Sequence, residues 1–496
     1  MYYPSLNEFL KLTKQGNVIP VYKEINADLD TPVSAFLKIE QDDYAFLFES
    51  VEGQENIARY SFLGSNPSLV LRSKGKAIQL IRPLKKEIQR FITRTDPLDE
   101  IKKLMQGFKP VSIKGLPRFC GGMVGYFGYD MVRFFEKIPD KNEDDLKLPD
   151  AVFLLTDTIL VFDHVNHTIK IVTNIILPED KGKLSESRKA ILYRDGLKKI
   201  EAIQKKLDTC ISEKKKPVVS NAKELKVISN FERKEFEDTV KRTKEFIQKG
   251  DIIQMVLSQR FKVNTRKPPL DIYRNLRSIN PSPYMYYLKL KDCMIIGSSP
   301  EMLVRCEDGI VETRPIAGTR PRGNNESEDR KLAAELLKDE KEKAEHIMLV
   351  DLGRNDLGRV CKSGKVEISE FMSVEKYSHV MHMVTEVKGE LDEKYDCFDV
   401  LRACFPAGTV SGSPKIRAME IIDQLENLRR GPYAGAVGYF SFSRNMDTCI
   451  TIRTIIMKDN VAYVQAGAGI VADSVPEKEY YETVNKAKAL IEAITK

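Results

Sequence analysis

The stretch GAVGYFSFSRNMDTCITIRTIIMKDNVAYVQAGAGIV, residues 435–471, decides the fold class. It holds three runs rich in β-branched and aromatic residues, at 435–443, 448–457 and 461–471, and only a few polar residues separate them. Runs of this composition between short polar breaks are typical of strands. The stretch therefore predicts three strands in succession.

Similar segments surround this stretch without a regular strand–helix alternation. Further strand-like runs occur at 45–50, 68–73, 252–263 and 284–290. Helical spacing predicts helices over 229–250, before Asn280, from about residue 327, and from residue 474 onward. Ser229 with Glu232, and Ser474 with Glu477, have the spacing of a capping box. Strand runs mixed with helix runs are typical of an α+β fold.

The chain has 496 residues, which at the usual domain size predicts two or three domains. Residues 185–216 are heavily charged and have helical spacing, and residues 217–226 are typical of a linker. We therefore predict a strand-rich first part over residues 1–180, a charged helix with a linker over 181–225, and a second part over 226–496.

Composition excludes several classes of protein. Hydrophobic residues make up 42% and charged residues 30% of the chain, as in a globular protein. Lys and Arg number 79 against 72 Asp and Glu, and the net charge of +7 is spread along the chain, so neither a nucleic-acid nor a membrane partner is indicated. The N-terminus lacks the basic start and apolar run of a secretion signal. The longest apolar stretch, residues 151–162, is too short to span a bilayer.

The cysteines and histidines predict a reduced, cytoplasmic protein. The eight cysteines form no CxxC pair and no ladder of close spacings. His379 and His382 are the only candidates for a zinc site, and no nearby Cys or His completes it.

Glu345 and Glu482 are candidate metal ligands. Glu345 precedes an apolar run that we expect to be buried, and Glu482 lies on the last predicted helix. Two such carboxylates can hold Mg²⁺ while waters and an anionic substrate fill its remaining positions. The alternative is that both are solvated helix residues, as most glutamates are.

Small residues mark two candidate anion sites. Gly467, Ala468 and Gly469 follow a strand, but the segment lacks the third glycine of a dinucleotide motif and comes too late for further βαβ units. Either their backbone N–H groups bind an anion, or they form an ordinary strand–turn–helix junction. Thr409, in GTVSGSPK (408–415), lies near a helix start that does not match the Walker pattern.

His382 and Arg453 complete the set of candidates. His382, among apolar neighbours, is either a structural residue or a proton donor to a leaving hydroxyl. Arg453 is predicted in the middle of a strand among apolar residues. A buried arginine there needs an anion, which is either an internal carboxylate or a ligand.

Eight longer blocks occur in one fixed order: SPEMLVR (299–305), RPIAGTRPRG (314–323), EHIMLVDLGRNDLGRV (345–360), HVMHMV (379–384), FPAGTVSGSPKIRAMEII (405–422), GAVGYF (435–440), TCITIRT (448–454) and QAGAGIVADSVPEKEYYET (465–483). Together they resemble the chorismate-utilising enzymes over nearly all of residues 226–496. Within that family the chain is most similar to the anthranilate-forming synthase subunits. FLFES (46–50), ARYSFLG (58–64) and PSPYMYYL (281–288) share this resemblance.

The resemblance implies roles for individual residues. Glu345 and Glu482 correspond to Mg²⁺ ligands, His382 to the residue that assists loss of the ring hydroxyl, and Thr409 to a pocket threonine. The residues that match the chorismate-binding set are Gly318, Thr319, Tyr433, Arg453, Gly467, Ala468 and Gly469. The fold implied is α+β, with large antiparallel sheets packed between helices.

The activity that the resemblance implies is the Mg²⁺-dependent conversion of chorismate and ammonia to anthranilate and pyruvate, the first step from chorismate to tryptophan. None of the eight cysteines lies in the Gly-rich elbow of a glutamine amidotransferase. A separate amidotransferase subunit is therefore implied as the source of ammonia, in a heterotetramer with two copies of each chain.

Two positions separate this reaction from its nearest alternatives. Many aminodeoxychorismate synthase components carry a lysine, which can act as a nucleophile, where this chain has Ala317. Isochorismate and salicylate synthases carry a lysine base where this chain has Gln254, and an amide cannot deprotonate water. A non-catalytic module that senses tryptophan is a further alternative. The presence of Glu345, Glu482 and His382 argues against it.

A regulatory pocket is also implied by the resemblance. Glu49 and Ser50, together with Pro283, Tyr284 and Met285, match the family's tryptophan pocket. The alternative is that the first pair ends a strand and the second group forms a turn into a core strand. The match implies inhibition by tryptophan, bound away from the metal.

Overall fold

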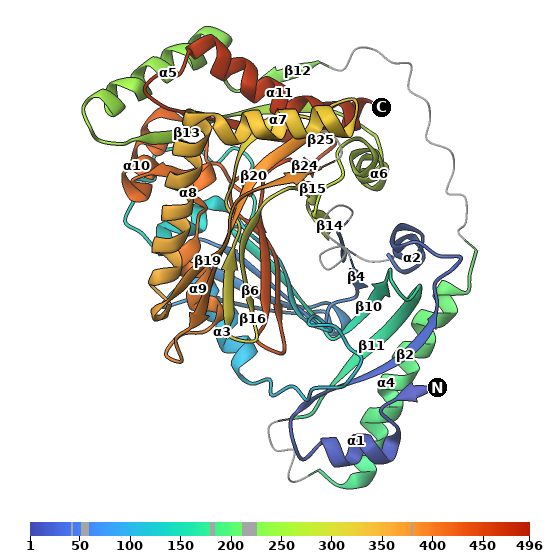
Figure 1. The fold of residues 1–496 in the computed structure, drawn as a ribbon. Coiled ribbons are helices and arrows are strands. Elements are labelled where there is room, and N and C mark those ends of the chain that lie inside the picture. The colour runs from blue at the N-terminus through green and yellow to red at the C-terminus, as the bar shows by residue number, and fades with distance from the viewer. Residues whose placement is uncertain (41–42, 51–58, 179–183, 211–225, 378–379) are drawn as a thin grey trace.

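The computed structural model describes residues 1–40, 43–50, 59–178, 184–210, 226–377 and 380–496. Within these ranges the strands form two antiparallel sheets (Figure 1). Sheet A has 13 strands in the order β1 (Tyr2–Tyr3), β2 (Val18–Asn26), β11 (Thr168–Ile176), β10 (Thr158–Asp163), β4 (Tyr60–Ser65), β3 (Tyr44–Glu49), β14 (Tyr284–Leu290), β15 (Met294–Ser299), β24 (Thr454–Lys458), β25 (Val461–Ile470), β13 (Gln254–Asn264) and β12 (Val227–Ser229), with β21 (Gly412–Ser413) paired to β13.

Sheet B has 12 strands among the described residues. Their order is β18 (Ile316–Pro321), β20 (Val380–Leu391), β17 (Ile310–Thr313), β16 (Met302–Glu307), β23 (Met446–Ile450), β22 (Ala436–Ser441), β8 (Gly122–Phe127), β9 (Ala151–Thr156), β5 (Leu69–Lys74), β6 (Ala77–Arg82) and β7 (Glu87–Ile92), with β19 (Cys361–Lys376) paired to β20.

Both halves of the chain contribute strands to both sheets. In sheet A, β3 pairs with β14, so that Glu49 lies opposite Met285. In sheet B, β8 pairs with β22. Strands of the first part therefore take hydrogen-bond partners from the second part. The domain boundary over 181–225 stays a prediction, and residues 211–225, which include most of the predicted linker, lie outside the described residues.

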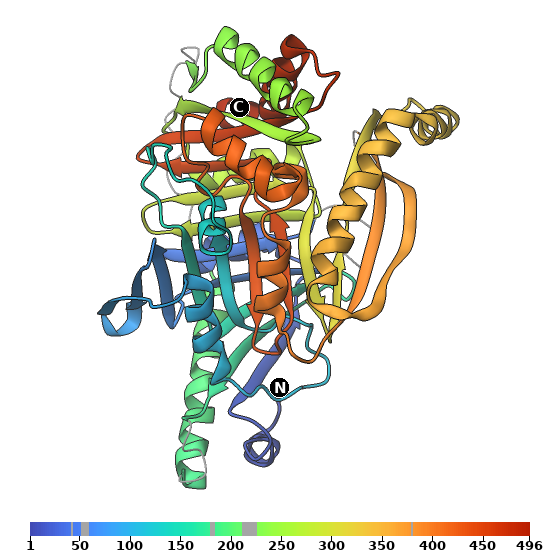
Figure 2. The ribbon, with the colours of Figure 1, turned by 90° about the vertical axis from the view of Figure 1, so that its left-hand side faces the viewer.

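The sheets pack face to face, with helices outside them (Figures 1 and 2). Phe46 and Tyr286 of sheet A meet Tyr126 and Leu154 of sheet B in the central core. Sheet A carries α1 (Leu6–Leu12), α2 (Pro32–Ile39), α4 (Glu186–Leu207), α6 (Pro269–Ile279) and α11 (Pro476–Thr495). Its β13 and β25 also carry α5 (Arg233–Gln248) and α10 (Lys415–Leu425). Sheet B carries α3 (Pro97–Gln106) and α9 (Cys397–Cys404), with the 3-10 turns η1 (Pro83–Lys85) and η2 (Tyr129–Phe134) in its connections, and η4 (Gly408–Val410) leads from α9 to β21 of sheet A. The α+β prediction is confirmed.

A lobe stands out from one side of this body. It consists of α7 (Glu326–Lys338), α8 (Glu340–Gly358), β18, β19 and β20, and Figure 2 shows its gold and orange elements on the right. In the lobe, α8 packs on all three strands. The lobe contacts the body through Glu345 of α8, which accepts a hydrogen bond from Gln254 of β13.

The apolar stretch 151–162 forms two strands in different sheets. β9 lies in the interior of sheet B and β10 in sheet A, and both are almost wholly buried. A strand covered on both faces needs apolar residues at every position, which explains the unbroken run. None of the described helices combines the length and the apolar character that a bilayer span needs.

Two predicted helix starts are wrong, and one predicted helix is interrupted. Ser229 ends β12 and its hydroxyl donates to Gln259 Oε1 at 2.6 Å, so α5 begins later, with Glu232 as its N-cap. Ser474 accepts from the N–H of Val471, and α11 begins at Pro476, whose fixed φ suits a first helical position. The helix predicted from residue 327 begins at Glu326 and is two helices, because Asp339 ends α7 and caps α8.

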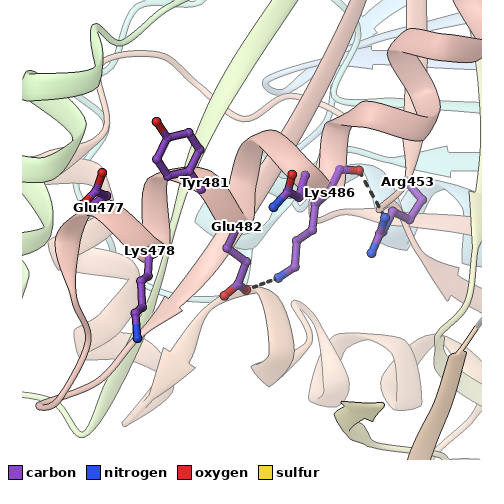
Figure 3. Close-up of a pocket in the computed structure, with 7 residues that line it drawn as sticks. Arg453, Glu477, Lys478, Tyr481, Glu482 and Lys486 are labelled. Carbon is purple, nitrogen blue, oxygen red and sulfur yellow. Dashed lines mark hydrogen bonds and ion pairs between the residues drawn. The ribbon is translucent and has the colours of Figure 1, made fainter. Parts of the chain in front are cut away.

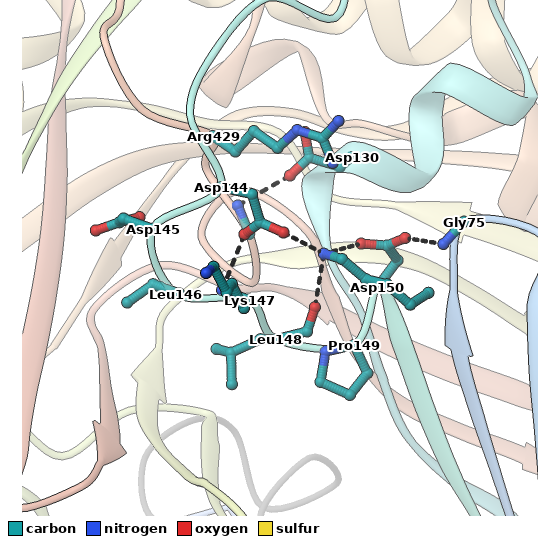
Figure 4. A network of polar contacts seen from close by, with 12 residues as sticks. Gly75, Asp130, Asp144, Asp145, Leu146, Lys147, Leu148, Pro149, Asp150 and Arg429 are labelled. Carbon is teal, nitrogen blue, oxygen red and sulfur yellow. Dashed lines mark hydrogen bonds and ion pairs between the residues drawn. The ribbon is translucent and has the colours of Figure 1, made fainter.

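A polar network holds the loop between η2 and β9 (Figure 4). Lys74 bridges Asp144 at 2.6 Å and Asp150 at 3.0 Å, and Asp150 also accepts from the N–H of Gly75 at 2.6 Å. From the same loop Asp145 pairs with Arg260 on β13 at 2.6 Å. The network thus ties the first part of the chain to the sheet that carries the candidate site.

Candidate active site

A cleft of about 610 Å³ opens along α11 (Figure 3). Glu482 projects into it from the helix and pairs with Lys486 at 2.7 Å. Lys486 Nζ also donates to the carbonyl of Gly467 on β25 at 3.0 Å. The other lining residues are Arg453, Glu477, Lys478, Tyr481 and Asn485. The cleft therefore presents charges of both signs beside the end of β25.

Arg453 lies on a turn and not in mid-strand, so that prediction is wrong. Residues 451–453 carry the chain from β23 in sheet B to β24 in sheet A, and Arg453 has a φ of 51°. Its Nη1 donates to the carbonyl of Lys486 at 3.2 Å, and it has no ion pair among the described residues. Burial lowers the pKa of Arg453, while Tyr433 and Glu482 oppose that shift. A guanidinium in this setting is suited to bind an anionic ligand.

Carboxylates from the lobe and the body face each other beside Arg453. On α8, Glu345 Oε1 accepts from Gln254 Nε2 of β13 at 3.2 Å. Burial raises the pKa of Glu345, and the nearby Glu342 and Glu482 raise it further. Glu479 on α11 has a raised pKa for the same two reasons, burial and Glu482. Carboxylates that destabilise one another's charge are stabilised by a cation between them.

This donor set fits Mg²⁺ held by few protein ligands. Among the described residues no three His, Cys, Asp or Glu side chains form a ready metal cage. Glu345 and Glu482 would hold the ion from two different elements, and oxygens of water and substrate would fill the remaining positions, as Mg²⁺ usually prefers. Sequence reasoning missed Glu342 and Glu479, which lie one turn before the predicted pair on the same helices.

Gly467, Ala468 and Gly469 lie inside β25 and not in a loop after it. β13 covers one edge of them, while β24 pairs with β25 only as far as Val464. Their other backbone edge therefore has no strand partner among the described residues. A Cβ on Gly467 would come within 2.8 Å of the Tyr433 hydroxyl, and one on Gly469 within 2.6 Å of Gln254 Nε2. Only glycine leaves room for these two side chains.

His382 lies on β20 beside the Gly318–Thr319 segment of β18. Its Nδ1 is 3.0 Å from the carbonyl oxygen of Gly318 and 3.1 Å from Thr319 Oγ1. A carbonyl only accepts, so Nδ1 carries the proton and Nε2 is the free acceptor. Burial and Arg453 lower the pKa of His382, opposed by the Gly318 bond. The ring is therefore neutral near pH 7. His379 lies outside the described residues.

Glu301 is a functional candidate that sequence reasoning missed. It is buried at the start of β16, in a small cavity of about 40 Å³ that Thr409 also lines. Burial raises the pKa of Glu301 to about 8, with opposition from the Thr409 hydroxyl and Lys486. A carboxyl that keeps its proton at neutral pH can act as an acid. The signal was present in the SPEMLVR block, where Glu301 follows Ser299 and Pro300.

Comparison with known proteins agrees with this geometry. The family described as chorismate binding enzyme matches residues 43–492. The chain belongs to the chorismate-binding enzymes.

Similar members of this enzyme family span the whole chain. An anthranilate synthase component 1 from Acetivibrio thermocellus is 52% identical and covers 100% of this chain and 99% of its own length. An anthranilate synthase component 1 from Aquifex aeolicus is 51% identical, and the match covers 99% of this chain and 97% of the relative's length. The crystal structure of anthranilate synthase component I from Streptococcus pneumoniae superposes with a TM-score of 0.76 at 38% identity and covers 94% of this chain and 98% of its own.

This chorismate-binding enzyme has a third cavity, of about 100 Å³, which no residue of α11 lines. The lining includes all five residues predicted for the regulatory pocket, Glu49, Ser50, Pro283, Tyr284 and Met285. They meet because β3 and β14 are adjacent strands, with Glu49 opposite Met285. Further lining comes from Phe48, Tyr60, Phe62, Tyr286, Arg305, Val437, Gly438, Tyr439, Asp447 and Cys449.

The polar groups of this cavity divide into paired and unpaired ones. Glu49 Oε2 accepts from the Tyr273 hydroxyl and pairs with Arg277 at 3.2 Å, while burial raises the pKa of Glu49. The Ser50 hydroxyl is buried and has no partner among the described residues. On the far wall Tyr284 donates to Asp447 at 3.0 Å. The cavity thus combines aromatic walls with a hydroxyl and a carboxylate at one end.

Proposed function

We propose that this chain converts chorismate and ammonia to anthranilate and pyruvate, as the synthase component of an anthranilate synthase. The observation that carries the proposal is that Glu482 of α11 and Arg453 of the turn between the sheets line one cleft, while Glu345 of the lobe lies near enough to Glu482 for its pKa to be raised by that carboxylate. A small dianion needs such separate fixed positive charges, a metal for one carboxylate and a guanidinium for the other.

The residues divide the reaction between them. Mg²⁺ on Glu345 and Glu482 would polarise the ring carboxylate and make the neighbouring ring carbon electrophilic. Ammonia adds to that carbon while the hydroxyl two carbons away leaves as water, taking its proton from Glu301. Loss of the ring proton and of the enolpyruvyl ether as pyruvate then yields anthranilate.

The proton donor here is Glu301 and not His382, because of their opposite pKa shifts. Glu301 has a pKa of about 8 and is protonated near pH 7, whereas His382 has a lowered pKa and is neutral. The free Nε2 of His382 instead accepts a hydrogen bond and orients the leaving hydroxyl beside Gly318 and Thr319. Thr409 lines the same small cavity as Glu301, and its hydroxyl lowers the pKa of the Glu301 carboxyl.

Gln254 and Ala317 support ammonia as the nucleophile. The Nε2 of Gln254 donates a hydrogen bond to Glu345. The Oε1 of Gln254 is buried and has no partner among the described residues. An amide oxygen can accept an N–H of ammonia and leave the nitrogen lone pair directed at the ring, but it cannot deprotonate water. Ala317 supplies no amine. Both residues disfavour the aminodeoxychorismate and isochorismate reactions.

One assay tests the proposal against its alternatives. Purified chain is incubated with chorismate, Mg²⁺ and ammonium, and the products are identified. We expect anthranilate and pyruvate in equal amounts. Aminodeoxychorismate, isochorismate, or binding without turnover would each refute the proposal and identify a different activity.

The ammonia donor and the inhibitor belong to the same proposal. A glutamine amidotransferase subunit supplies ammonia, in a heterotetramer of two copies of each chain, and tryptophan binds the cavity between β3 and β14. The unpaired Ser50 hydroxyl and the Glu49 carboxylate would take the ammonium of tryptophan, and the aromatic walls its indole.

Ser50→Phe tests the inhibitor site. The added ring fills a cavity of about 100 Å³, so inhibition by tryptophan should weaken at least about 10-fold while the rate without tryptophan is retained. The measurement is a tryptophan titration at fixed chorismate for wild type and variant. Identical titration curves would place the inhibitor elsewhere.

A further inference from the structure

The turn that presents Arg453 is held in an unfavourable backbone conformation. Arg453 has a φ of 51°, in the left-handed region that a residue with a long side chain rarely adopts. The turn is also the place where the chain changes from sheet B to sheet A. Its neighbours must therefore fix it, and the contacts that do so decide where the guanidinium lies.

Three hydrogen bonds between backbone groups hold the turn. Thr451 donates to the carbonyl of Gly435 at 2.9 Å, Ile452 to that of Ile450 at 2.9 Å, and Ser298 to that of Arg453 at 3.1 Å. A side-chain bond completes the set, since the hydroxyl of Thr454 donates to the carbonyl of Ile452 at 2.8 Å. Thr454 thereby braces the turn from the residue that follows Arg453.

Thr454 is itself held by Tyr286 from the neighbouring part of sheet A. The two hydroxyl oxygens are 2.6 Å apart and buried. Thr454 has one proton, which Ile452 accepts, so the Tyr286 phenol is the donor to Thr454. The chain of donors therefore runs from Tyr286 through Thr454 to the backbone beside Arg453.

Tyr286 also forms part of the wall of the cavity between β3 and β14. Its ring has no room to move toward β15, because a Cβ on Gly297 would lie 2.0 Å from the ring. On the opposite side of the turn, Asp447 and Cys449 of β23 line the same cavity. Of the two strands that flank Arg453, β23 therefore lines the cavity directly, and β24 is linked to it through the bond between Tyr286 and Thr454.

We propose that Tyr286 is a positioning residue for Arg453 and acts through its hydroxyl. Through the bond from this hydroxyl to Thr454, a ligand bound in the β3–β14 cavity would change the position of Arg453 in the substrate cleft. This inference rests on the proposed function, which places chorismate at Arg453 and tryptophan in the cavity. A ligand that shifts the Tyr286 ring releases Thr454, the turn relaxes, and Arg453 leaves the position that binds the substrate carboxylate. By reciprocity, bound chorismate weakens tryptophan binding by the same factor.

The test removes the hydroxyl and leaves the ring. In Tyr286→Phe the KM for chorismate should rise roughly 3- to 10-fold, the size of one neutral hydrogen bond, while kcat changes less than about 2-fold. A carboxylate contact made equally in the ground and transition states affects KM and not kcat. Tyr287→Phe is the matched control on the same strand, and we expect wild-type constants from it because Tyr287 packs against Phe36 on the other face.

The coupling is measured by equilibrium dialysis of labelled tryptophan, with Mg²⁺ and with or without chorismate, in the absence of ammonia. In wild type chorismate should weaken tryptophan binding, and in Tyr286→Phe this factor should fall toward 1 while tryptophan still binds. Thr454→Val should reproduce the effect, Thr454→Ser should restore wild-type behaviour, and the double variant should be no worse than either single one.

The outcomes separate this inference from the function on which it rests. If wild type forms no anthranilate or binds no tryptophan, the proposed function fails. If wild type does both, while Tyr286→Phe and Thr454→Val keep the wild-type KM and the wild-type coupling factor, only the relay fails. A Thr454→Ser variant as defective as Thr454→Val would also refute the relay, because a serine keeps the hydroxyl.

Discussion

Individual residues of the cleft owe their chemistry to their surroundings. Glu345 and Glu301 are both glutamates, yet Glu345 faces other carboxylates beside Gln254, whereas Glu301 is enclosed with Thr409. A cation would stabilise the carboxylates around Glu345, whereas burial keeps the Glu301 carboxyl protonated at neutral pH. In the proposed function one residue type would therefore serve as metal ligand and as acid.

The metal assignment predicts the effect of Glu482→Gln. An amide removes one anionic ligand of Mg²⁺, so turnover should fall at least about 100-fold while the fold is kept. Activity is measured over a Mg²⁺ titration, and circular dichroism checks the fold. Glu492→Gln is the matched control, because Glu492 is on the same helix in the same type of lysine pair, with Lys496 at 2.9 Å. Wild-type rates from Glu482→Gln would remove Glu482 from the site.

The Glu301 assignment predicts the alkaline limb of the pH profile. The carboxyl must carry its proton to act as an acid, and the pKa of about 8 means that the proton is lost as the pH rises through 8. The kcat/KM for chorismate should therefore fall above pH 8.

A second variant checks which group causes this limb. The Thr409 hydroxyl lowers the pKa of Glu301, so Thr409→Val should move the limb to higher pH. The measurement is kcat/KM between pH 6 and 10 at saturating ammonia, counted as free NH₃. A limb that stays at the same pH in Glu301→Gln would belong to another group.

At the scale of elements, a buried ion pair supports the loop that carries Tyr433. Arg430 is fully buried and forms two bonds to Glu426, at 2.9 and 2.7 Å. It also donates to the carbonyls of Val410 and Val256, and its guanidinium lies 5.6 Å from the ring of Tyr433. The pair therefore joins η4, β13 and the Tyr433 loop into one unit.

Arg430→Ala should lower the free energy of unfolding by about 3–5 kcal/mol, because it leaves the Glu426 carboxylate buried and unpaired. Chemical denaturation measures this loss. Arg354→Ala is the comparison, since Arg354 forms an exposed pair with Asp351 at 3.3 Å and its removal should change stability little. Equal effects of the two changes would contradict the role of the buried pair.

At the scale of the whole molecule, the two parts of the chain complete each other's sheets. β14 of the second part pairs with β3, and β22 pairs with β8. Without the first part both strands would become open edges, and such edges aggregate.

A chain of residues 226–496 alone is therefore expected to be insoluble, although it carries every residue assigned to the cleft. Co-expression with residues 1–210 as a separate chain should restore soluble, active protein. Solubility after expression and anthranilate formation are the measurements. A soluble and active 226–496 fragment would show that the catalytic part folds without the shared sheets.

Local sequence was sufficient for most of the predicted strands, but not for the run 448–457, which is divided between β23 and β24. The runs that became β3, β13, β14, β22 and β25 have apolar patterns that pairing and burial require. Helix starts were predicted less well. Ser229 and Ser474 match the local pattern of a helix cap, but Ser229 is paired in a strand and the last helix begins at Pro476. The break at Asp339 was missed because helical spacing continues on both sides of it.

The sequence by itself determined the family and predicted candidate site residues, because Glu345, Glu482, His382 and the β25 glycines lie in contiguous motifs. Tertiary structure decided what depends on distant parts of the chain. It moved Arg453 from a predicted strand to the turn between two sheets, since β23 and β24 take different partners. It also raised the pKa of Glu301 by burial and placed Glu49 beside Met285. Pairing, burial and electrostatic shifts arise from neighbours in space, and no short window of sequence contains those neighbours.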